Sequence, residues 1–458
     1  MQAVIGALID ALGESGVTLG AEIAERATSF WDASPTRALA IVKPRDTAQV
    51  SAVLTLCHRF GQPVVTQGGR TGCARGADAA GHEIILSLER MNAIERLDTV
   101  GGTATVQAGV TLQTLQEAAR EHDWLFALDL GARGSCTLGG NIATNAGGIN
   151  VMRYGMMRSL VLGLEAVLAD GTVLSNMDEV LKNNAGYDLK QLLVGTEGTL
   201  GVVTRAVVRL HPLPSSCNAA LVALESFEQV TTLLQTLQRD LAGTLSAFEV
   251  MWNSYFAAAT APGGHRPPMD GHHPFYVMLQ AEGADPTEDA RRFERLLETA
   301  FEQGLIVDAV VPRSEAERRA LWEVRENFEA MLKNRDTFLY DVSLPIRHME
   351  EYADAVRDRV LARWPQARCI QFGHIADGNL HLFVQPESDD ADHAASDEAV
   401  YAPLLPFGGS VSAEHGIGIE KKAWLLRNRD AVDLRVMQAV KRALDPHNIL
   451  NPGRVFDL

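Results

Sequence analysis

Two histidines on either side of a predicted turn carry the clearest chemical signal in this sequence. The segment Gly373-His-Ile-Ala-Asp-Gly-Asn-Leu-His contains Asp-Gly, a dipeptide typical of two-residue β-hairpin turns. If Asp377 and Gly378 form the centre of the turn, His374 lies directly opposite His381. Cross-strand partners have Cβ atoms roughly 4.5–5.5 Å apart, so we expect the two imidazoles to be able to share a divalent cation. The alternative is a pair of ordinary surface histidines.

A second short segment supplies the groups that two histidines lack for catalysis. It reads Ser412-Ala-Glu-His-Gly-Ile-Gly. Glu414 is predicted to be a third, anionic metal ligand, which leaves open positions for a substrate, as in catalytic zinc sites. His415 is predicted to be a general base that works near neutral pH. Taken alone, Glu-His-Gly is typical of an ordinary loop.

Three glycine-rich segments in the first half predict a cradle for phosphate groups. They span residues 67–72, 131–148 and 195–201. Small side chains let the backbone approach a ligand closely, and its amides and hydroxyls can then hold phosphate oxygens. The first segment follows a predicted strand but has neither GxGxxG nor Gly-Lys-Ser/Thr spacing, which argues against a Rossmann or Walker site. Arg70 is a candidate counter-charge. The alternative is a set of tight turns and surface loops.

Arg325 is the candidate for holding a substrate carboxylate. It lies in Trp322-Glu-Val-Arg-Glu, on a predicted amphipathic helix. A guanidinium fork matches a carboxylate in a bidentate pair. The alternative is a helix-surface arginine paired with Glu329, four residues later.

The elements that must position these residues follow an α+β pattern. In the first half, short apolar strands alternate with amphipathic helices up to His211-Pro-Leu-Pro, where two prolines mark a domain boundary. The second half contains long amphipathic helices between strands. Helices are predicted at 47–60, 110–121, 227–241 and 287–301, and strands at 38–42, 63–66, 84–88, 103–106, 160–168, 206–210, 275–279, 338–344 and 370–372.

Composition limits the function classes. The chain has 458 residues, too many for one ordinary domain, so two domains are expected. Its formal net charge of −17 argues against a nucleic-acid partner. Its five cysteines show no CxxC spacing and are typical of reduced thiols. The N-terminal apolar residues have no preceding cation, unlike a signal peptide. No apolar run reaches the roughly 18 residues of a membrane span. We therefore expect a soluble, cytoplasmic protein with no transmembrane segment.

The three glycine-rich segments, taken together, resemble the FAD-binding domain of the vanillyl-alcohol oxidase / p-cresol methylhydroxylase superfamily. The resemblance covers about residues 37–214 and includes Gly-Gly-Arg-Thr-Gly, Gly-Ser-Cys-Thr-Leu-Gly-Gly-Asn, Tyr154-Gly155 and Gly195-Thr-Glu-Gly. It implies two α+β subdomains with FAD extended between them. Some members attach the flavin through His or Cys. The segments 66–72 and 131–148 contain no His, so we expect non-covalent FAD, with Cys73 and Cys136 as the alternative attachment points.

The same resemblance implies a set of flavin-binding residues in the three segments and near the C-terminus. They are Gln67, Gly68, Gly69, Arg70, Thr71, Gly72, Gly134, Ser135, Thr137, Gly140, Asn141, Thr144, Asn145, Gly147, Gly148, Glu197, Gly198, Val202 and Asn451.

The histidine pair and Glu414-His415 resemble the cap domain of the D-2-hydroxyacid dehydrogenases in this superfamily, which include D-lactate and D-2-hydroxyglutarate dehydrogenases. In that group the two His and the Glu bind zinc, and the adjacent His takes the hydroxyl proton. Arg325 matches the arginine that holds the substrate carboxylate, and residues 445–454 resemble a terminal segment that returns to the flavin. The implied organisation is a helical lead-in (1–34), the FAD-binding domain (35–214), an α+β cap with an antiparallel sheet and helices (215–410), and a C-terminal segment (411–458).

This resemblance implies FAD-dependent, metal-assisted oxidation of a D-2-hydroxy acid to the 2-oxo acid, with hydride transfer to flavin N5. Zinc is the expected metal, and manganese or iron would also suit the ligands. An electron-transfer flavoprotein or a quinone is the expected electron acceptor, molecular oxygen is the alternative, and a second copy of the chain is a candidate partner. Two other classes stay open: a flavin-binding subunit of a glycolate-oxidase-like complex, and a non-redox flavoenzyme.

Three positions in the cap depart from relatives specific for 2-hydroxyglutarate. Those proteins have a Thr, a Lys and an Asn where this chain has Glu329, Leu339 and Phe383. We therefore expect a substrate with a small or apolar side chain, such as D-lactate. D-2-hydroxyglutarate or D-malate is the alternative, with Arg347 as a possible replacement for the missing cation.

Overall fold

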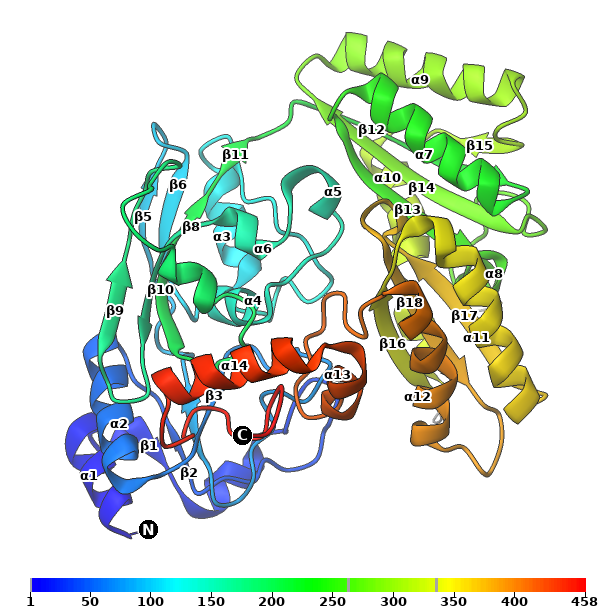
Figure 1. The fold of residues 1–458 in the computed structure, drawn as a ribbon. Helices are drawn as coiled ribbons and strands as arrows, with labels where there is room; N and C mark the ends of the chain where they lie inside the picture. Colours follow the sequence, from blue (N-terminus) through cyan, green and yellow to red (C-terminus); the bar gives the residue numbers. More distant parts are fainter. Residues whose placement is uncertain (1, 262–263, 334–336) are drawn as a thin grey trace. The chain divides into compact units, whose positions relative to one another are not determined.

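The computed structural model describes residues 2–261, 264–333 and 337–458 (Figure 1). Contacts divide the chain into two compact units. Unit 1 consists of Met1–Gly148, Tyr154–Leu213 and Glu414–Leu458, and unit 2 consists of Ile149–Arg153 and Pro214–Ala413. The C-terminal segment therefore belongs to unit 1, although unit 2 precedes it in the sequence. None of the described helices is long and apolar enough to cross a membrane.

The first sheet of unit 1 has the strand order β1-β2-β4-β3, and both β2 and β3 run parallel to β4. Its parallel strands are almost entirely buried, as expected for strands covered on both faces. Helix α2 begins after Asp46, whose side chain accepts a hydrogen bond from Gln49 N. The N-terminal segment is not only helical, because β1 pairs with β2. The elements are α1 (Gln2–Leu12), β1 (Val17–Thr18), β2 (Ala40–Val42), α2 (Thr47–Phe60), β3 (Val64–Gln67) and β4 (Ile84–Ser87).

The second sheet of unit 1 is antiparallel, with the order β5-β6-β10-β8-β9. His211-Pro212, at the predicted domain boundary, forms a two-residue strand with Trp124-Leu125. The elements are β5 (Ile94–Asp98), β6 (Thr103–Gln107), α3 (Leu112–Arg120), β7 (Trp124–Leu125), α4 (Leu138–Thr144), α6 (Met157–Leu160), β8 (Val161–Val167), β9 (Val173–Asn176), β10 (Val202–Arg209) and β11 (His211–Pro212). Between α4 and α6 lies α5 (Val151–Tyr154), of which all but Tyr154 belongs to unit 2.

Unit 2 is built on a seven-stranded antiparallel sheet with the order β15-β12-β14-β13-β17-β18-β16. Residues of α8 and α10 share one apolar cluster with one face of the sheet. On the other face, Phe227 of α7 stacks on Trp252, and Gln371 bonds to α11. The elements are β12 (Ser216–Leu224), α7 (Phe227–Leu241), β13 (Leu245–Trp252), α8 (Asn253–Ala259), β14 (Phe275–Gly283), α9 (Pro286–Glu302), β15 (Asp308–Val310), α10 (Glu315–Glu326), β16 (Phe338–Ser343), α11 (Met349–Arg363), β17 (Arg368–Gly373), β18 (Asn379–Gln385) and α12 (His393–Tyr401).

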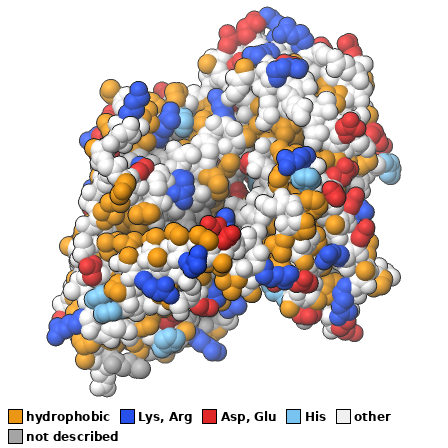
Figure 2. Space-filling model, viewed as in Figure 1, with side chains coloured by type: hydrophobic (Ala, Val, Ile, Leu, Met, Phe, Trp, Pro, Cys, Tyr) orange, Lys and Arg blue, Asp and Glu red, His pale blue; other side chains and the backbone are white. Residues whose placement is uncertain are grey.

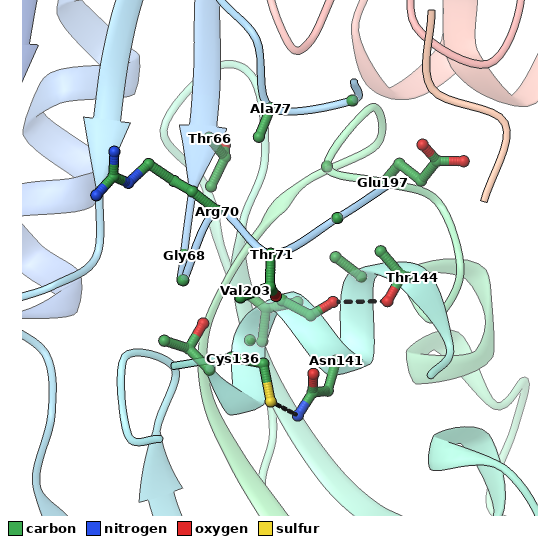
Figure 3. Close-up of a pocket in the computed structure, with 18 of the residues that line it drawn as sticks. Thr66, Gly68, Arg70, Thr71, Ala77, Cys136, Asn141, Thr144, Glu197 and Val203 are labelled. Atoms are coloured by element: carbon green, nitrogen blue, oxygen red, sulfur yellow. Dashed lines mark hydrogen bonds between the residues drawn. The ribbon is translucent and has the colours of Figure 1, made fainter. Parts of the chain in front are cut away.

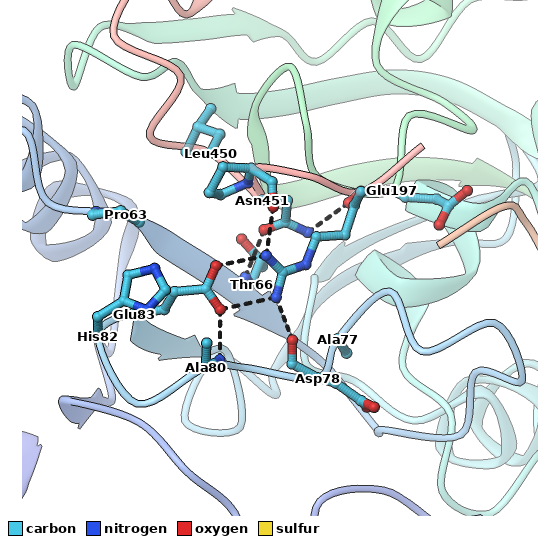
Figure 4. A network of polar contacts seen from close by, with 12 residues as sticks. Pro63, Thr66, Ala77, Asp78, Ala80, His82, Glu83, Glu197, Leu450 and Asn451 are labelled. Carbon is cyan, nitrogen blue, oxygen red and sulfur yellow. Dashed lines mark hydrogen bonds and ion pairs between the residues drawn. The ribbon is translucent and has the colours of Figure 1, made fainter. Parts of the chain in front are cut away.

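The C-terminal segment is tied to the first sheet of unit 1. After α13 (Lys422–Asn428) and α14 (Ala431–Leu444), the chain runs beside β3, where Val64 N donates to Ile449 O and Asn451 N donates to Val64 O. The buried guanidinium of Arg454 then pairs with both carboxylate oxygens of buried Glu83, at 2.6 and 2.9 Å (Figure 4). This pair fixes the end of the chain against unit 1.

The charged surface is mixed. On the face shown in Figure 2, cationic side chains are interspersed with acidic ones and form no continuous basic patch.

We predict that Arg454→Met lowers the free energy of unfolding by about 3–5 kcal/mol, because it leaves Glu83 buried without its counter-charge. Urea denaturation of the full chain measures this change. Arg96→Met is the matched control, since Arg96 forms an exposed pair with Glu179, and it should cost less than about 1 kcal/mol. Equal effects of the two substitutions would contradict the anchoring role of Arg454.

Candidate active site

A pocket in unit 1 brings the three glycine-rich segments together (Figure 3). His415, which precedes α13, and Asn451, near the end of the chain, also line it. Predicted flavin-binding or catalytic residues that line it are Gly68, Gly69, Arg70, Thr71, Gly72, Thr137, Gly140, Asn141, Thr144, Glu197, Gly198, Val202, His415 and Asn451. Lining residues that the sequence analysis did not select include Thr66, Gly76, Ala77, Gly139 and Val203.

The chemistry of this pocket fits a phosphate-bearing cofactor. The hydroxyls of Thr66 and Thr137 are buried and have no hydrogen-bond partner among the described residues. Thr137 is the N-cap residue of α4, yet its side chain makes no capping hydrogen bond, so it remains available to a ligand. A Cβ on Gly68 would lie 2.3 Å from Thr137 Oγ1, and a Cβ on Gly69 would lie 2.0 Å from Ser135 O. Only glycine allows this close approach of the two loops.

Other predicted flavin-binding residues lie outside the lining and support the loops instead. Gln67 donates to Ala77 O, and Asn145 ends α4 in the left-handed conformation while its side chain accepts from Arg158 N. Gly134, Ser135, Gly147 and Gly148 also lie outside the lining. The guanidinium of Arg70, the proposed counter-charge, donates to Ala27 O.

Glu197 and Asn451 connect the pocket to the loop that carries His415. The two carboxylate oxygens of Glu197 accept from Ile417 N at 2.7 Å and from Gly418 N at 2.8 Å. Burial raises the pKa of Glu197, although the two amides and Lys421 oppose the shift. Asn451 accepts from Thr66 N and donates to Glu197 O. Both residues therefore position segments of the pocket wall.

In unit 2, the polar residues of the candidate site lie on one face of the sheet. Each lies two positions from an apolar residue, namely Met251, Phe372, Phe383 or Leu339, and these four form or pack against the apolar cluster on the face covered by α8 and α10. Since side chains two apart on a strand share a face, the candidate polar residues point to this same side. These residues are Glu249 on β13, Asp341 on β16, His374 after β17 and His381 on β18.

The predicted hairpin register is wrong. His381 pairs with Phe372 on β17, and His374 lies just beyond the strand. Residues 375–377 form a 3₁₀ turn, and Gly378 adopts the left-handed conformation that ends it. The Asp-Gly dipeptide is thus part of a longer loop. The two imidazole rings still lie 5.2 Å apart, centroid to centroid, at nearly perpendicular angles.

A metal ion would suit the groups that meet here. One ligand atom from each of His374, His381 and Glu414 lies within 4.8 Å of the others. Two histidines with one glutamate are a donor set of catalytic zinc sites. Glu414 follows Ala413, whose amide donates to Asp341 Oδ2 at 3.1 Å. The histidines are nearly buried, so they form a shielded site.

Arg325 is held by Glu249. Its Nε and Nη2 both donate to Glu249 Oε2, at 2.9 and 2.5 Å, and its guanidinium stacks 4.6 Å from the centre of the Phe372 ring. The side chain of Glu329, the alternative partner, lies outside the described part of the chain. Burial opposes ionisation of Glu249, but the charges of His374 and Arg325 and their hydrogen bonds lower its pKa to about 2. Glu249 is therefore a carboxylate at neutral pH.

Glu249 and Asp341 were missed by the sequence analysis. Each is a single acidic residue in an otherwise apolar or weakly polar strand, and each is at most 1% exposed. Acidic side chains are rarely fully buried unless they are paired. A lone acid in such a strand is the signal that could have indicated them.

Comparisons with known proteins now define the class. The structure of p-cresol methylhydroxylase with bound substrate superposes with a TM-score of 0.80, at 17% identity, over 100% of this chain and 97% of that one. The two chains therefore share a fold, and the predicted α+β class is confirmed.

Sequence comparisons give the family. A model described as FAD linked oxidases, C-terminal domain, matches residues 213–455, and one described as FAD binding domain matches 38–176. The chain is 38% identical to D-2-hydroxyglutarate dehydrogenase of Xanthomonas citri pv. viticola, over 94% of this chain and 91% of that protein. It is 39% identical to the mitochondrial D-2-hydroxyglutarate dehydrogenase of Bos taurus, over 91% and 76%. This protein belongs to the FAD-linked oxidase family.

We predict that Gly69→Ala weakens FAD binding about tenfold or more, because the new Cβ would meet Ser135 O and overpacking costs about 1–3 kcal/mol. FAD content and the dissociation constant, measured by flavin fluorescence, test this. Gly81→Ala is the control, since nothing lies within 4 Å of its Cβ position. A Gly69→Ala protein with normal FAD affinity would contradict the proposed cradle.

Proposed function

We propose that this protein oxidises a D-2-hydroxy acid to the corresponding 2-oxo acid, using FAD and a divalent metal held by His374, His381 and Glu414. The observation that carries the proposal is that Glu414 and His415 are consecutive residues of the chain. Glu414 lies with the two histidines, and His415, the next residue, lines the pocket of unit 1. The names of the relatives, which describe oxidation of D-2-hydroxyglutarate, support the reaction class.

Each group has a role that follows from its surroundings. When bound, FAD supplies the two-electron oxidation and the metal supplies Lewis acidity. His415 accepts the hydroxyl proton of the substrate. Glu197 accepts hydrogen bonds from the amides of Ile417 and Gly418 and so holds the loop of His415 in place. Arg325 binds the substrate carboxylate through Nη1, since Nε and Nη2 already donate to Glu249.

The pocket favours non-covalent FAD. Cys136 lines the pocket, and its sulfur accepts a hydrogen bond from Asn141 (Figure 3). Burial raises the pKa of the Cys136 thiol, and Asn141 only partly opposes the shift. Because the thiolate is the nucleophile, a raised pKa disfavours attachment of the flavin through this residue.

The substrate side chain is proposed to be small or apolar. Leu339 and Phe383 are register partners on β16 and β18, and both belong to the apolar cluster that contains Phe372. Arg347, the possible replacement cation, lies in the turn after β16, where its Nε contacts His348. D-2-hydroxyglutarate is the second candidate, and the comparisons lean toward it, because relatives of that name match more than 90% of this chain. An electron-transfer flavoprotein or a quinone is the proposed acceptor, and a homodimer is the proposed assembly.

We predict that anaerobic addition of D-2-hydroxy acids bleaches the flavin of the zinc-loaded protein and that L-enantiomers do not. D-Lactate and larger apolar acids should react fastest, because Leu339 and Phe383, two positions along their strands from Asp341 and His381, are apolar. Flavin absorbance reports both rates. Fastest bleaching by D-2-hydroxyglutarate would favour the second candidate substrate, and no bleaching by any hydroxy acid would contradict the proposed function.

We predict that prolonged chelation abolishes turnover and that added zinc restores it in the wild type. His374→Ala and His381→Ala should lose both bound metal and turnover, because each removes one ligand. Elemental analysis and acceptor-reduction assays measure the two quantities. His272→Ala, which removes an exposed histidine, is the control and should keep both. Full metal content in either ligand variant would argue against this metal site.

A further inference from the structure

We propose that Glu249 is a positioning residue that serves the metal ligand His374 and the substrate arginine Arg325 at the same time. This inference rests on the proposed function, since it assigns a role within that site. Among the described residues, Glu249 contacts both groups with separate carboxylate oxygens.

The strand register brings Glu249 and His374 together. On β13 and β17, Val250 pairs with Gly373. Because the strands are antiparallel, the next position places Glu249 across from His374, just where the ladder ends. Glu249 Oε1 accepts from Nδ1 of His374 at 2.6 Å. A carboxylate accepts but does not donate, so Nδ1 carries the proton and Nε2 is the atom that can face a metal.

The second oxygen of Glu249 fixes Arg325. Oε2 accepts from Nε and Nη2, so one edge of the guanidinium is occupied and its orientation is set. The stacking of the guanidinium on Phe372 restricts the remaining rotation. Since Glu249 is 1% exposed, water has little access to replace either contact. The spacing between the carboxylate-binding arginine and the metal ligand therefore depends on one side chain.

The other histidine has a similar but weaker arrangement, which serves as an internal comparison. Asp341 pairs with His381 across β16 and β18, but its Oδ1 lies 3.6 Å from His381 Nδ1. Asp341 also accepts from Asn379 Nδ2 and from Ala413 N. Each histidine thus has a buried carboxylate behind it, and the shorter contact belongs to Glu249. A carboxylate behind a metal-binding histidine usually strengthens metal binding.

The test compares Glu249→Gln and Glu249→Asp in the full-length, FAD-loaded protein. Zinc affinity is measured by competition with a chromophoric chelator, and KM and kcat are measured with the best D-2-hydroxy acid. We expect Glu249→Gln to weaken zinc binding about 10–100-fold and to raise KM, because His374 and Arg325 both lose the carboxylate that orients them. Glu249→Asp keeps the charge but is one methylene shorter, so we expect it to impair the same two quantities and to be informative if the Gln variant does not fold.

Glu165→Gln is the matched control. Glu165 is a nearly buried carboxylate in unit 1 that accepts from Thr47 and Thr204, so its loss should alter stability and leave zinc affinity and KM unchanged. Wild-type zinc affinity and KM in both Glu249 variants would overturn this inference and leave the proposed function intact. A wild-type protein that neither binds zinc nor oxidises any hydroxy acid would overturn the proposed function itself.

Discussion

The candidate site of unit 2 depends on one buried charge. A carboxylate removed from water carries a desolvation penalty of several kcal/mol, which only close and well-oriented partners offset. Glu249 has such partners in Arg325 and His374, and it lies on β13, near the middle of the seven-stranded sheet. A strand with a neighbour on each side cannot easily shift its register. The sheet therefore fixes the position of Glu249, and Glu249 in turn fixes Arg325 and His374.

Glu414 and His415 follow the point where the chain leaves unit 2 and returns to unit 1. The chain enters unit 2 at Pro214 and returns to unit 1 at Glu414. Asp341 holds the amide of Ala413 on one side of this crossing, and Glu197 holds the amides of Ile417 and Gly418 on the other. Glu414 and His415 lie between the two anchors. Covalent adjacency therefore limits how far the candidate base can lie from the candidate metal ligand.

Much of the fold could be predicted because its signals are local. The helix predicted at 47–60 is α2, and that predicted at 227–241 is α7, which begins with a capping box at Ser226. The hairpin register could not be predicted, because Asp377-Gly378 suits several turns and the sheet contacts of its flanks decide between them. The contact between Glu249 and Arg325 could not be predicted from local sequence patterns either. They are 76 residues apart, and only the packing of α10 on the sheet brings them together.

The choice of substrate is a question of where a second negative charge could go. The side chains of Leu339 and Phe383 are apolar and offer no counter-charge to a distal carboxylate, and an unpaired buried charge is strongly unfavourable. Arg325 cannot serve both carboxylates equally, because Glu249 already occupies one edge of its fork. A D-2-hydroxy acid with an apolar side chain has no distal carboxylate, so it needs neither a second cation nor a second contact with Arg325. A dicarboxylate would need Arg347 or another cation to approach its distal carboxylate, and the present contact of Arg347 with His348 would then have to change.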